Sequence, residues 1–425
     1  MTANDTPDPD SLAISFDPTV ARRLQALAAD RGEALDARAR AHLLEWLGDW
    51  GLRVATHAVA PGETLWAIAR RYYGDGHKAD VLAAYNRIAD PTLLQVGDTI
   101  AVPEPVESAP LPAGQSPYLH GLHDRGGEYL MERAGKPGWV LCSETVGADP
   151  NDWSSEAYAD LADRGLGVMV RLNNGYCPGG TLPPRQDYAA FSRRCGNFVE
   201  KSDGCHLWVI GNEPNTAVER PGGPRHGQPI LPTDYAAAFR ACRDEIRSRP
   251  GHEADQVITA AVGPWNSQTA YPGNLRGDWV TYLADILAAL DDALDGISLH
   301  AYSRDADPAS ICSEERMAPP FQERRAGFRA YTDFMAAIPE ALRHLPVYIT
   351  EADQDVAWED ANRGWIQGAY DEVAAWNSHP AHQRIRSLIL YRWQRRPHDI
   401  WHLEGKRQVL ADLEGALRLG HRWHP

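Results

Sequence analysis

The sequence lacks the features that would assign it to several common protein classes. No apolar run approaches the roughly 18 residues that a membrane-spanning helix requires. The acidic start, residues 1–10, has neither the positive region nor the apolar stretch of a signal peptide. The 6 cysteines form no CxxC pair and no dense framework. A His-Glu-x-x-His motif, a Gly-x-Ser-x-Gly elbow and a phosphate-binding loop are also missing, so we expect neither a metal nor a cofactor.

Positive charge and phenylalanine are both scarce. The 425 residues include 42 Lys and Arg against 58 Asp and Glu, a formal net charge of -16. A phosphate backbone is bound by a basic surface, so this balance argues against a nucleic-acid partner, although acidity is also typical of proteins that are simply soluble. Phe occurs 7 times, against 14 Trp and 16 Tyr. Aromatic rings that carry a polar atom suit clefts that stack on sugars, and they also suit ordinary cores.

The first 56 residues combine an acidic tail with two helical patterns. Asp17-Pro18 begins the first pattern, and the second covers residues 34–50. A short strand at residues 12–16 would give the strand–helix–helix order of ribbon-helix-helix DNA-binding proteins. That strand offers no basic or amide side chain for reading bases. A small helical segment at 1–56 is therefore the favoured interpretation.

Residues 57–103 form a compact pattern of strand, helix, helix and strand. The turn Gly62-Glu63-Thr64-Leu65, the pair Ile68-Ala69, Asn86 and the ending Gly97-Asp98-Thr99-Ile100 resemble the LysM carbohydrate-binding module, with His57 in place of an aromatic residue. The resemblance implies a βααβ fold that binds glycans containing N-acetylglucosamine, such as peptidoglycan or chitin. A role as a spacer or protein-docking unit is the alternative. The implied glycan-binding residues are Gly62, Glu63, Thr64, Asp90, Pro91 and Leu93.

From residue 117 onward, short apolar runs alternate with amphipathic segments. A proline-rich linker, residues 104–116, precedes this region and should tether the two modules. Eight strands that are each followed by a helix predict an α/β fold, a (β/α)8 TIM barrel over residues 117–425. The strand candidates are 118–122, 139–143, 167–172, 207–210, 257–262, 296–300, 346–350 and 387–393.

Two carboxylic acids follow apolar strands of this pattern. Glu213 lies in Gly211-Asn212-Glu213-Pro214 after the fourth strand, and the proline prevents the ladder from continuing. Glu351 follows the seventh strand. Because the carboxyl ends of barrel strands meet at one face, we expect the two acids to be neighbours. Cleavage of a glycosidic bond requires such a pair, one acid to protonate the leaving oxygen and one to attack or stabilise the sugar.

These motifs in residues 117–425 resemble the clan A glycoside hydrolases. The resemblance implies a retaining mechanism in which Glu213 is the general acid/base and Glu351 the nucleophile. It also implies that Asn212 binds the sugar 2-hydroxyl and that His300 and Tyr302 form a positioning pair. From their positions at strand ends we add four further candidates for substrate binding: Arg171, which could hold Glu351 ionised, Trp393 as a stacking platform, and His120 and Trp265 in the cleft.

The sequence therefore predicts a modular retaining glycoside hydrolase that cleaves a β-glycosidic bond in a polysaccharide or cell-wall glycan. The LysM module would hold the enzyme on that glycan, and neither nucleic acid nor a membrane is an expected partner. Glycan-directed modules favour the cell wall or the extracellular space, reached by a non-classical route. The alternative is a non-catalytic glycan-binding or scaffold protein whose barrel is inactive. A metal site at His120 and His123 is disfavoured, because two histidines without a suitably spaced carboxylate make a poor ligand set.

Overall fold

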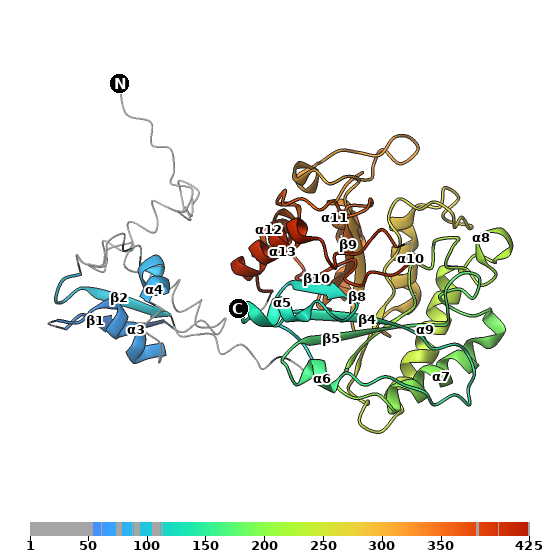
Figure 1. Ribbon diagram of the computed structural model, residues 1–425, viewed down its shortest axis with the longest axis horizontal. Coiled ribbons are helices and arrows are strands. Elements are labelled where there is room, and N and C mark those ends of the chain that lie inside the picture. The colour runs from blue at the N-terminus through green and yellow to red at the C-terminus, as the bar shows by residue number, and fades with distance from the viewer. Residues whose placement is uncertain are drawn as a thin grey trace, which may run out of the picture. The chain divides into compact units, whose positions relative to one another are not determined.

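The computed structural model divides the chain into two compact units, residues 1–109 and residues 110–425, which are described separately (Figure 1). The first 53 residues and most of 104–113 lie outside the described part, and with them the predicted N-terminal helices and most of the predicted linker, residues 104–116. No described helix is long and apolar enough to cross a membrane. The structure describes residues 54–60, 62–73, 79–86, 88, 94–103, 111, 114–379, 382–397 and 399–423.

The small unit contains two antiparallel strands and two helices in the expected βααβ order. β1 (Val54–Ala58) pairs with β2 (Thr99–Pro103), and α3 (Leu65–Tyr73) and α4 (Ala79–Tyr85) connect them. Thr64 begins α3, because its Oγ1 accepts a hydrogen bond from the main-chain N–H of Ala67 at 3.2 Å. The buried core consists of Val59, Leu65, Ile68, Ala69, Leu82, Ile100 and Val102.

Asn86 links the end of α4 to β2 in this unit. Its Nδ2 donates to the carbonyl oxygens of Leu82 at 2.9 Å and Ala101 at 2.8 Å, and its Oδ1 accepts from the N–H of Ala101 at 2.8 Å. The Asn86 side chain therefore satisfies both main-chain polar groups of Ala101 in β2.

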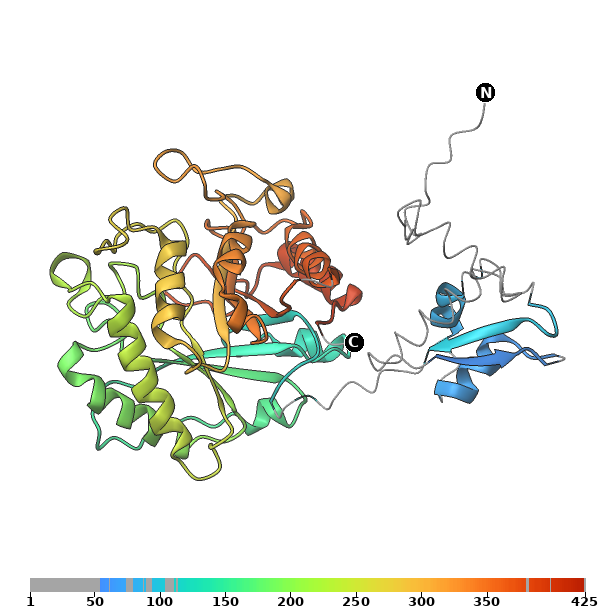
Figure 2. The ribbon, with the colours of Figure 1, turned by 180° about the vertical axis from the view of Figure 1, so that it is seen from behind.

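The large unit is a nearly closed barrel of eight parallel strands, which confirms the predicted fold class (Figures 1 and 2). The strand order is β7-β6-β5-β4-β3-β10-β9-β8. The two strands at the ends of this order, β7 and β8, are joined by isolated hydrogen bonds, including Thr259 N–H to Gly296 O at 3.3 Å. The strands are β3 (His120–His123), β4 (Trp139–Thr145), β5 (Gly167–Asn173), β6 (Leu207–Ile210), β7 (Gln256–Thr259), β8 (Ile297–Tyr302), β9 (Val347–Asp353) and β10 (Ile385–Leu390).

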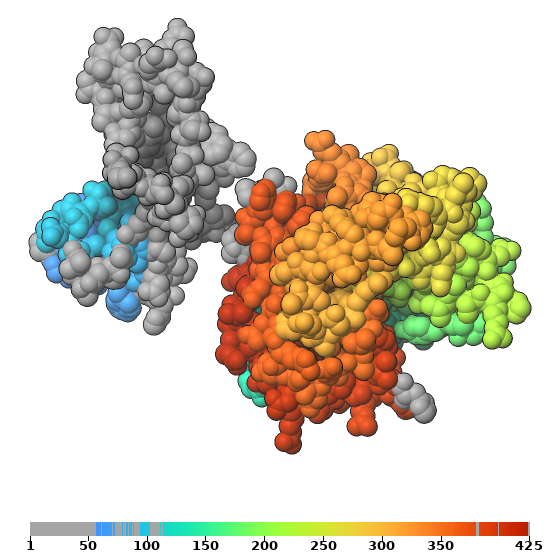
Figure 3. Space-filling view, turned by 90° about the horizontal axis from the view of Figure 1, so that it is seen from above, coloured from blue at the N-terminus to red at the C-terminus, as the bar shows by residue number. Residues whose placement is uncertain are grey.

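Helices follow every strand and cover the outside of the barrel. In the space-filling view, the segments drawn in green, yellow, orange and red abut in one continuous surface (Figure 3). A short helix, α8 (Gly223–His226), lies in the loop after β6. The main helices are α5 (Glu128–Arg133), α6 (Ala159–Ala162), α7 (Tyr188–Glu200), α9 (Pro232–Arg247), α10 (Trp279–Leu290), α11 (Ala330–Ala337), α12 (Trp365–Ser378) and α13 (Arg407–Leu419).

Alternation along the strands produces two apolar layers. On β6, Leu207 and Val209 face the barrel interior, while Trp208 and Ile210 pack against the helices. The interior cluster also contains Trp139 and Tyr348, whose rings meet edge to face at 5.6 Å. This layer fills the barrel interior below its carboxyl end.

The last strand ends earlier than the sequence pattern indicates. The expected strand at 387–393 is β10, which ends at Leu390. Arg392 N–H then donates to Trp401 O at 2.9 Å, and Trp393 N–H donates to His123 O at 2.8 Å. The backbone after Leu390 therefore bonds to a loop and to the end of β3 instead of extending the sheet.

Replacing Asn86 by Ala should destabilise the small unit around β2. The change leaves the two main-chain groups of Ala101 without a partner, at a cost of about 1–3 kcal/mol. Hydrogen–deuterium exchange of the full-length chain should show faster exchange in peptides covering residues 94–103. Gln95→Ala is the matched control, because the Gln95 side chain is exposed and the hydrogen bonds of Gln95 to Asp98 use its main-chain N–H and carbonyl groups. Equal exchange in both variants would contradict this role of Asn86.

Candidate active site

A β-bulge directs Glu351 into the barrel. Ile349 of β9 pairs with Leu299 of β8, but the next pair is Glu351 with His300, so Thr350 is an extra residue. Tyr348 faces the interior and Ile349 the helices, and strict alternation would turn Glu351 outward with Ile349. The bulge reverses this direction, as such insertions do near functional sites.

Glu213 reaches the same face from the loop that follows β6. Its backbone has a φ of 34°, in the left-handed region that non-glycine residues seldom adopt. Two hydrogen bonds hold the turn: Glu213 N–H donates to Ala261 O at 3.0 Å, and Thr216 N–H donates to Glu213 O at 2.9 Å. This conformation projects the carboxyl group over the end of β8.

The hydroxyl of Tyr302 touches both acids. It lies 3.3 Å from Glu213 Oε1 and 2.9 Å from Glu351 Oε2. The two carboxylate oxygens therefore cannot be farther apart than these two lengths laid end to end. The structure thus brings together the two acids that are 138 positions apart in the sequence.

Three nitrogen-bearing side chains surround Glu351, which is buried. Arg171 Nη1 lies 2.5 Å from Glu351 Oε1, and His300 Nε2 and His123 Nε2 each lie 3.8 Å from it. Burial by itself would raise the pKa of Glu351, but His300, Arg171 and His123 outweigh burial and lower that pKa to about 2. Glu351 is therefore a carboxylate throughout the neutral pH range. Arg171, which the sequence analysis suggested could hold it ionised, is its closest cation.

His300 connects the two acids from below. It is fully buried, and its Nδ1 lies 2.8 Å from Glu213 Oε1 and 2.7 Å from the Tyr302 hydroxyl. Arg171 Nη2 lies 3.5 Å from its Nε2. The His300 ring therefore contacts Glu213, Tyr302 and Arg171 together and fixes their relative positions.

The two acids open into a cavity of about 340 Å³. Burial and the negative charges of its neighbours raise the pKa of three further acids in it, that of Glu219 to about 7 and those of Asp353 and Asp355 above their ordinary range. The cavity therefore holds more carboxyl groups than it can ionise together at little cost. Its lining residues are His123, Arg171, Tyr176, Asn212, Glu213, Glu219, Tyr302, Glu351, Asp353, Asp355, Tyr391, Arg392 and Trp401.

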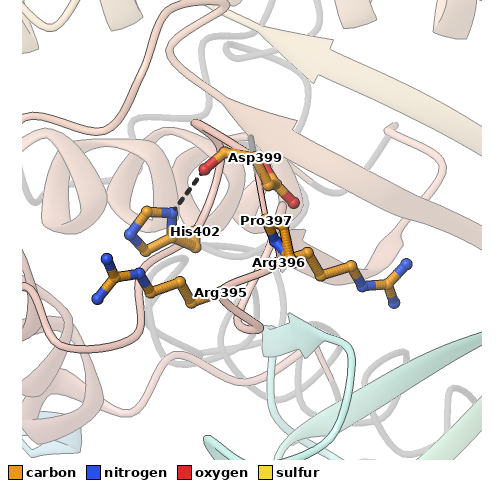
Figure 4. Close-up of a pocket in the computed structure, with 5 residues that line it drawn as sticks. All are labelled: Arg395, Arg396, Pro397, Asp399 and His402. Carbon is orange, nitrogen blue, oxygen red and sulfur yellow. Dashed lines mark hydrogen bonds between the residues drawn. The ribbon is translucent and has the colours of Figure 1, made fainter.

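A second hollow, of about 370 Å³, lies on the loop after β10 (Figure 4). Arg395, Arg396, Pro397, Asp399 and His402 line it, and the side chains of Arg395 and Arg396 extend away from each other. Asp399 links it to the cavity at Glu213 and Glu351, because its Oδ2 lies 2.8 Å from Nε of Arg392, which lines that cavity. The same loop therefore forms part of both hollows.

His120 does not reach the cavity, which corrects the expectation of a role in the cleft. It is on β3 with Leu122, which faces the helices, so alternation also turns His120 outward. Its Nε2 bonds to the carbonyl oxygen of Lys136 at 2.7 Å, and its ring stacks on Tyr118 at 5.1 Å. Burial lowers the pKa of His120 to about 4, which favours the neutral form of this structural residue.

Trp393 and Trp265 also lie outside the cavity lining. The indole of Trp393 packs so closely on Gly126 and Gly127 that neither position has room for a side chain, and only 5% of Trp393 is exposed. Trp265 is half-buried and donates from Nε1 to Arg325 O at 3.0 Å, with its ring 6.5 Å from that of Tyr302. The tyrosine and tryptophan residues that do line the cavity are Tyr176, Tyr302, Tyr391 and Trp401.

Several lining residues were not selected from the sequence. Asp353 is two positions beyond Glu351 on the same face of β9, and period-two alternation could have found it. Glu219, Tyr176 and Trp401 lie in loops, where no periodicity indicates which way a side chain points. Only the folded chain brings these loops over the end of the barrel.

In the small unit, the described candidates shape the loop before α3. Gly62 has a φ of 78°. Glu63 Oε2 accepts from the Ala60 N–H at 2.9 Å and lies 2.7 Å from His57 Nε2, contacts that lower the pKa of Glu63. The remaining candidates, Asp90, Pro91 and Leu93, lie outside the described residues.

The comparison with protein families identifies the small unit. The LysM domain model matches residues 57–103. This segment is a LysM domain. Two esterases of Mycobacterium tuberculosis, Esterase Rv1288 of strain H37Rv and Esterase MT1326 of strain CDC 1551, are each 47% identical to the chain over 51 residues. That match covers 12% of this chain and 11% of each esterase, so it concerns a short segment only.

Three solved structures illustrate the similarity of the barrel to known proteins. A GH128 (subgroup II) endo-beta-1,3-glucanase from Sorangium cellulosum is 16% identical, covers 70% of this chain and 98% of its own, and has a TM-score of 0.42. A GH5 family lichenase from Caldicellulosiruptor sp. F32 is 15% identical, covers 70% of this chain and 85% of its own, and has a TM-score of 0.42. Cel44A, a GH family 44 endoglucanase from Clostridium thermocellum, is 11% identical, covers 72% of this chain and 75% of its own, and has a TM-score of 0.42.

Removing the Arg171 guanidinium should destabilise the barrel in a pH-dependent way. Arg171→Met leaves Glu351 buried without its closest cation, so we expect a loss of about 3–5 kcal/mol near pH 7. The wild-type pair contributes stability above the ordinary carboxyl pKa, and this contribution disappears as pH falls through about 2. The variant has a higher Glu351 pKa, so its deficit should shrink as the pH falls below 5.

The measurement is denaturant unfolding followed by tryptophan fluorescence. The double variant Arg171→Met/Glu351→Gln should recover much of the loss, because it removes the unpaired charge. Arg363→Met is the matched control: Arg363 and Glu359 form an exposed pair at 2.8 Å, and its loss should cost less than about 1 kcal/mol. A pH-independent deficit in Arg171→Met would contradict the assignment.

Proposed function

We propose that the protein is a retaining glycoside hydrolase. The observation that carries the proposal is the Tyr302 hydroxyl in contact with both acids, because it limits the separation of their oxygens to about 6 Å. Retaining pairs lie about 5–5.5 Å apart, whereas inverting pairs need roughly 6.5–9.5 Å to admit a water molecule. The separation therefore favours direct attack by one acid on the sugar.

The environments of the two acids assign their roles. Glu351 is held ionised by Arg171, His300 and His123, as a nucleophile requires. Glu213 is the more exposed of the two, with 19% of its side chain exposed against 8% for Glu351, so it is open to a leaving group and to water. The same two carboxylates therefore serve as acid and nucleophile through their surroundings alone.

The reaction proceeds in two displacements. Glu213 gives its proton to the glycosidic oxygen while a Glu351 oxygen bonds to the anomeric carbon, and the leaving chain departs as an alcohol. Glu213, now a carboxylate, takes a proton from water, whose oxygen displaces Glu351 from the anomeric carbon. Tyr302 donates to Glu351 Oε2 and keeps that carboxylate oriented. Asn212, which lines the cavity, binds the sugar beside the reacting carbon.

The LysM domain suits a polymeric substrate that contains N-acetylglucosamine, such as peptidoglycan or chitin. Binding through this domain raises the local concentration of the glycan around the tethered barrel. The glycan that the LysM domain binds and the glycan that the barrel cleaves need not be identical, provided that both belong to the same wall. A non-catalytic scaffold remains the competing function, and the variants below separate the two.

Glu351→Gln should abolish hydrolysis of aryl β-glycosides, and Glu213→Gln should reduce kcat/KM by about 10²–10⁴-fold. The loss in Glu213→Gln should be smaller for leaving groups that need no proton. NMR of the first product should show the β-anomer. Glu359→Gln, an exposed acid outside the cavity, is the charge-matched control. A wild-type chain inactive across a broad panel of β-glycosides would support the scaffold function, and an α-anomer as first product would refute retention.

Loss of the LysM domain should affect polymers only. A chain consisting of residues 110–425 should hydrolyse small aryl glycosides like the full chain, since the cavity lies within the large unit. It should sediment far less with insoluble peptidoglycan and chitin, because the tether is lost. Equal sedimentation of the two chains would show that the LysM domain does not bind these glycans.

A further inference from the structure

The carboxyl groups of the catalytic cavity outnumber its cations. Five carboxyl groups and two guanidinium groups line it. Arg171 is paired with Glu351, and Arg392 is engaged from outside the cavity by Asp399 at 2.8 Å and Asp124 at 3.5 Å. Neither arginine is therefore available to the remaining acids of the cavity.

Glu219 is the acid with the most evident unmet need. It is 9% exposed, and its Oε1 accepts from Asn212 Nδ2 at 3.3 Å. Its Oε2 and the Oδ1 of Asn212 are buried without a hydrogen-bond partner among the described residues. Two unpaired acceptors on a pair of bonded side chains in the cavity call for a ligand group with more than one hydrogen to donate.

A bound metal ion does not fit this arrangement. Among the described residues, the only group of three or more potential ligands with metal-like spacing is His206, His252 and Asp255. Those residues precede β6 and β7, at the opposite end of the strands from the catalytic acids. The cavity acids are too dispersed to share one ion.

A neutral sugar also leaves the imbalance in place. A hydroxyl donates one hydrogen, and an acetamide N–H donates one and adds a bulky acyl group, while an ammonium donates three and carries the opposite charge. Burial and the charges of Glu213 and Glu351 raise the pKa of Glu219 to about 7, and a bound cation would oppose that rise. The group that satisfies both the acceptors and the charge is an ammonium.

We propose that the cavity binds a sugar with a free amine, a 2-amino-2-deoxyhexose unit of a glycan, whose ammonium lies against Glu219 and Asn212. Glu219 is then a specificity-determining residue of the hydrolase. The inference rests on the proposed function for its catalytic meaning. The affinity of the cavity for the amino sugar can be measured separately, whether or not a glycosidic bond is cleaved.

The binding experiment uses the full-length chain and three monosaccharides that differ only at carbon 2: glucosamine, N-acetylglucosamine and glucose. Calorimetric titration at pH 7 should give an affinity for glucosamine at least about 30-fold above that for glucose, the factor expected for a desolvated charge pair. Glu219→Gln should abolish this preference. Since the LysM domain is the same in both chains, the difference between them reports the cavity.

The pH dependence supplies a readout that a structural role of Glu219 would not produce. Affinity for glucosamine should rise as pH increases from 6 through about 7, where Glu219 ionises, and should fall again once the amine loses its proton. Affinity for glucose should stay flat over this interval. Glu359→Gln should keep the wild-type preference and profile.

Hydrolysis provides the second arm. Oligomers of β-1,4-linked glucosamine, N-acetylglucosamine and glucose share one backbone, and the glucosamine oligomer should have the highest kcat/KM. Failure to cleave any of them, with the glucosamine preference intact in calorimetry, would refute the hydrolase proposal or its linkage and leave the amine site standing. Glucose binding as tightly as glucosamine, or a preference over glucose that survives in Glu219→Gln, would overturn the inference.

Discussion

The ion pair between Arg171 and Glu351 determines the charge distribution of the whole cavity. Both side chains are buried, so solvent cannot stabilise either charge, and Glu351 depends on Arg171 for its ionised form. Fixing the negative charge on Glu351 raises the cost of ionising its neighbours. Burial, with a smaller contribution from the charge of Glu351, raises the pKa of both Glu219 and Asp353. One arginine on β5 therefore keeps Glu351 charged among buried acids whose pKa values are raised.

The opposite end of the barrel uses carboxylate chemistry for a different purpose. Asp255 accepts from Trp208 Nε1 at 2.6 Å and lies 2.7 Å from the Nδ1 atoms of both His206 and His252. Burial alone would raise the pKa of Asp255, but these hydrogen bonds keep it lowered. This acid has its partners built into the protein, whereas Glu219, which lines the cavity, has one buried oxygen without a hydrogen-bond partner among the described residues. The contrast matches the division of a barrel into a stabilising amino-terminal face and a reactive carboxyl-terminal face.

Much of the fold was accessible from the sequence because it depends on local patterns. Leu207–Ile210 is apolar and short, and β6 has the bounds that the pattern gave. The barrel prediction required only eight such runs in alternation with helices, and the LysM domain was evident from turn and cap residues such as Thr64. The end of β10 was misplaced because its backbone partners, Trp401 and His123, are remote in the chain and no local pattern reports them.

The sequence by itself determined the (β/α)8 order, the LysM domain and the presence of an acid after β6 and another on β9, since periodicity and turn chemistry are local properties. Tertiary structure alone decided which side chains meet. The bulge at Thr350 turned Glu351 inward against simple alternation, while that same alternation turned His120 away from the cavity. Loop residues such as Glu219 entered the site, and Trp393 was buried against Gly126 and Gly127. The physical reason is that the direction of a side chain and its distance from other side chains depend on strand register and on contacts between distant segments. Local sequence patterns do not report either of these.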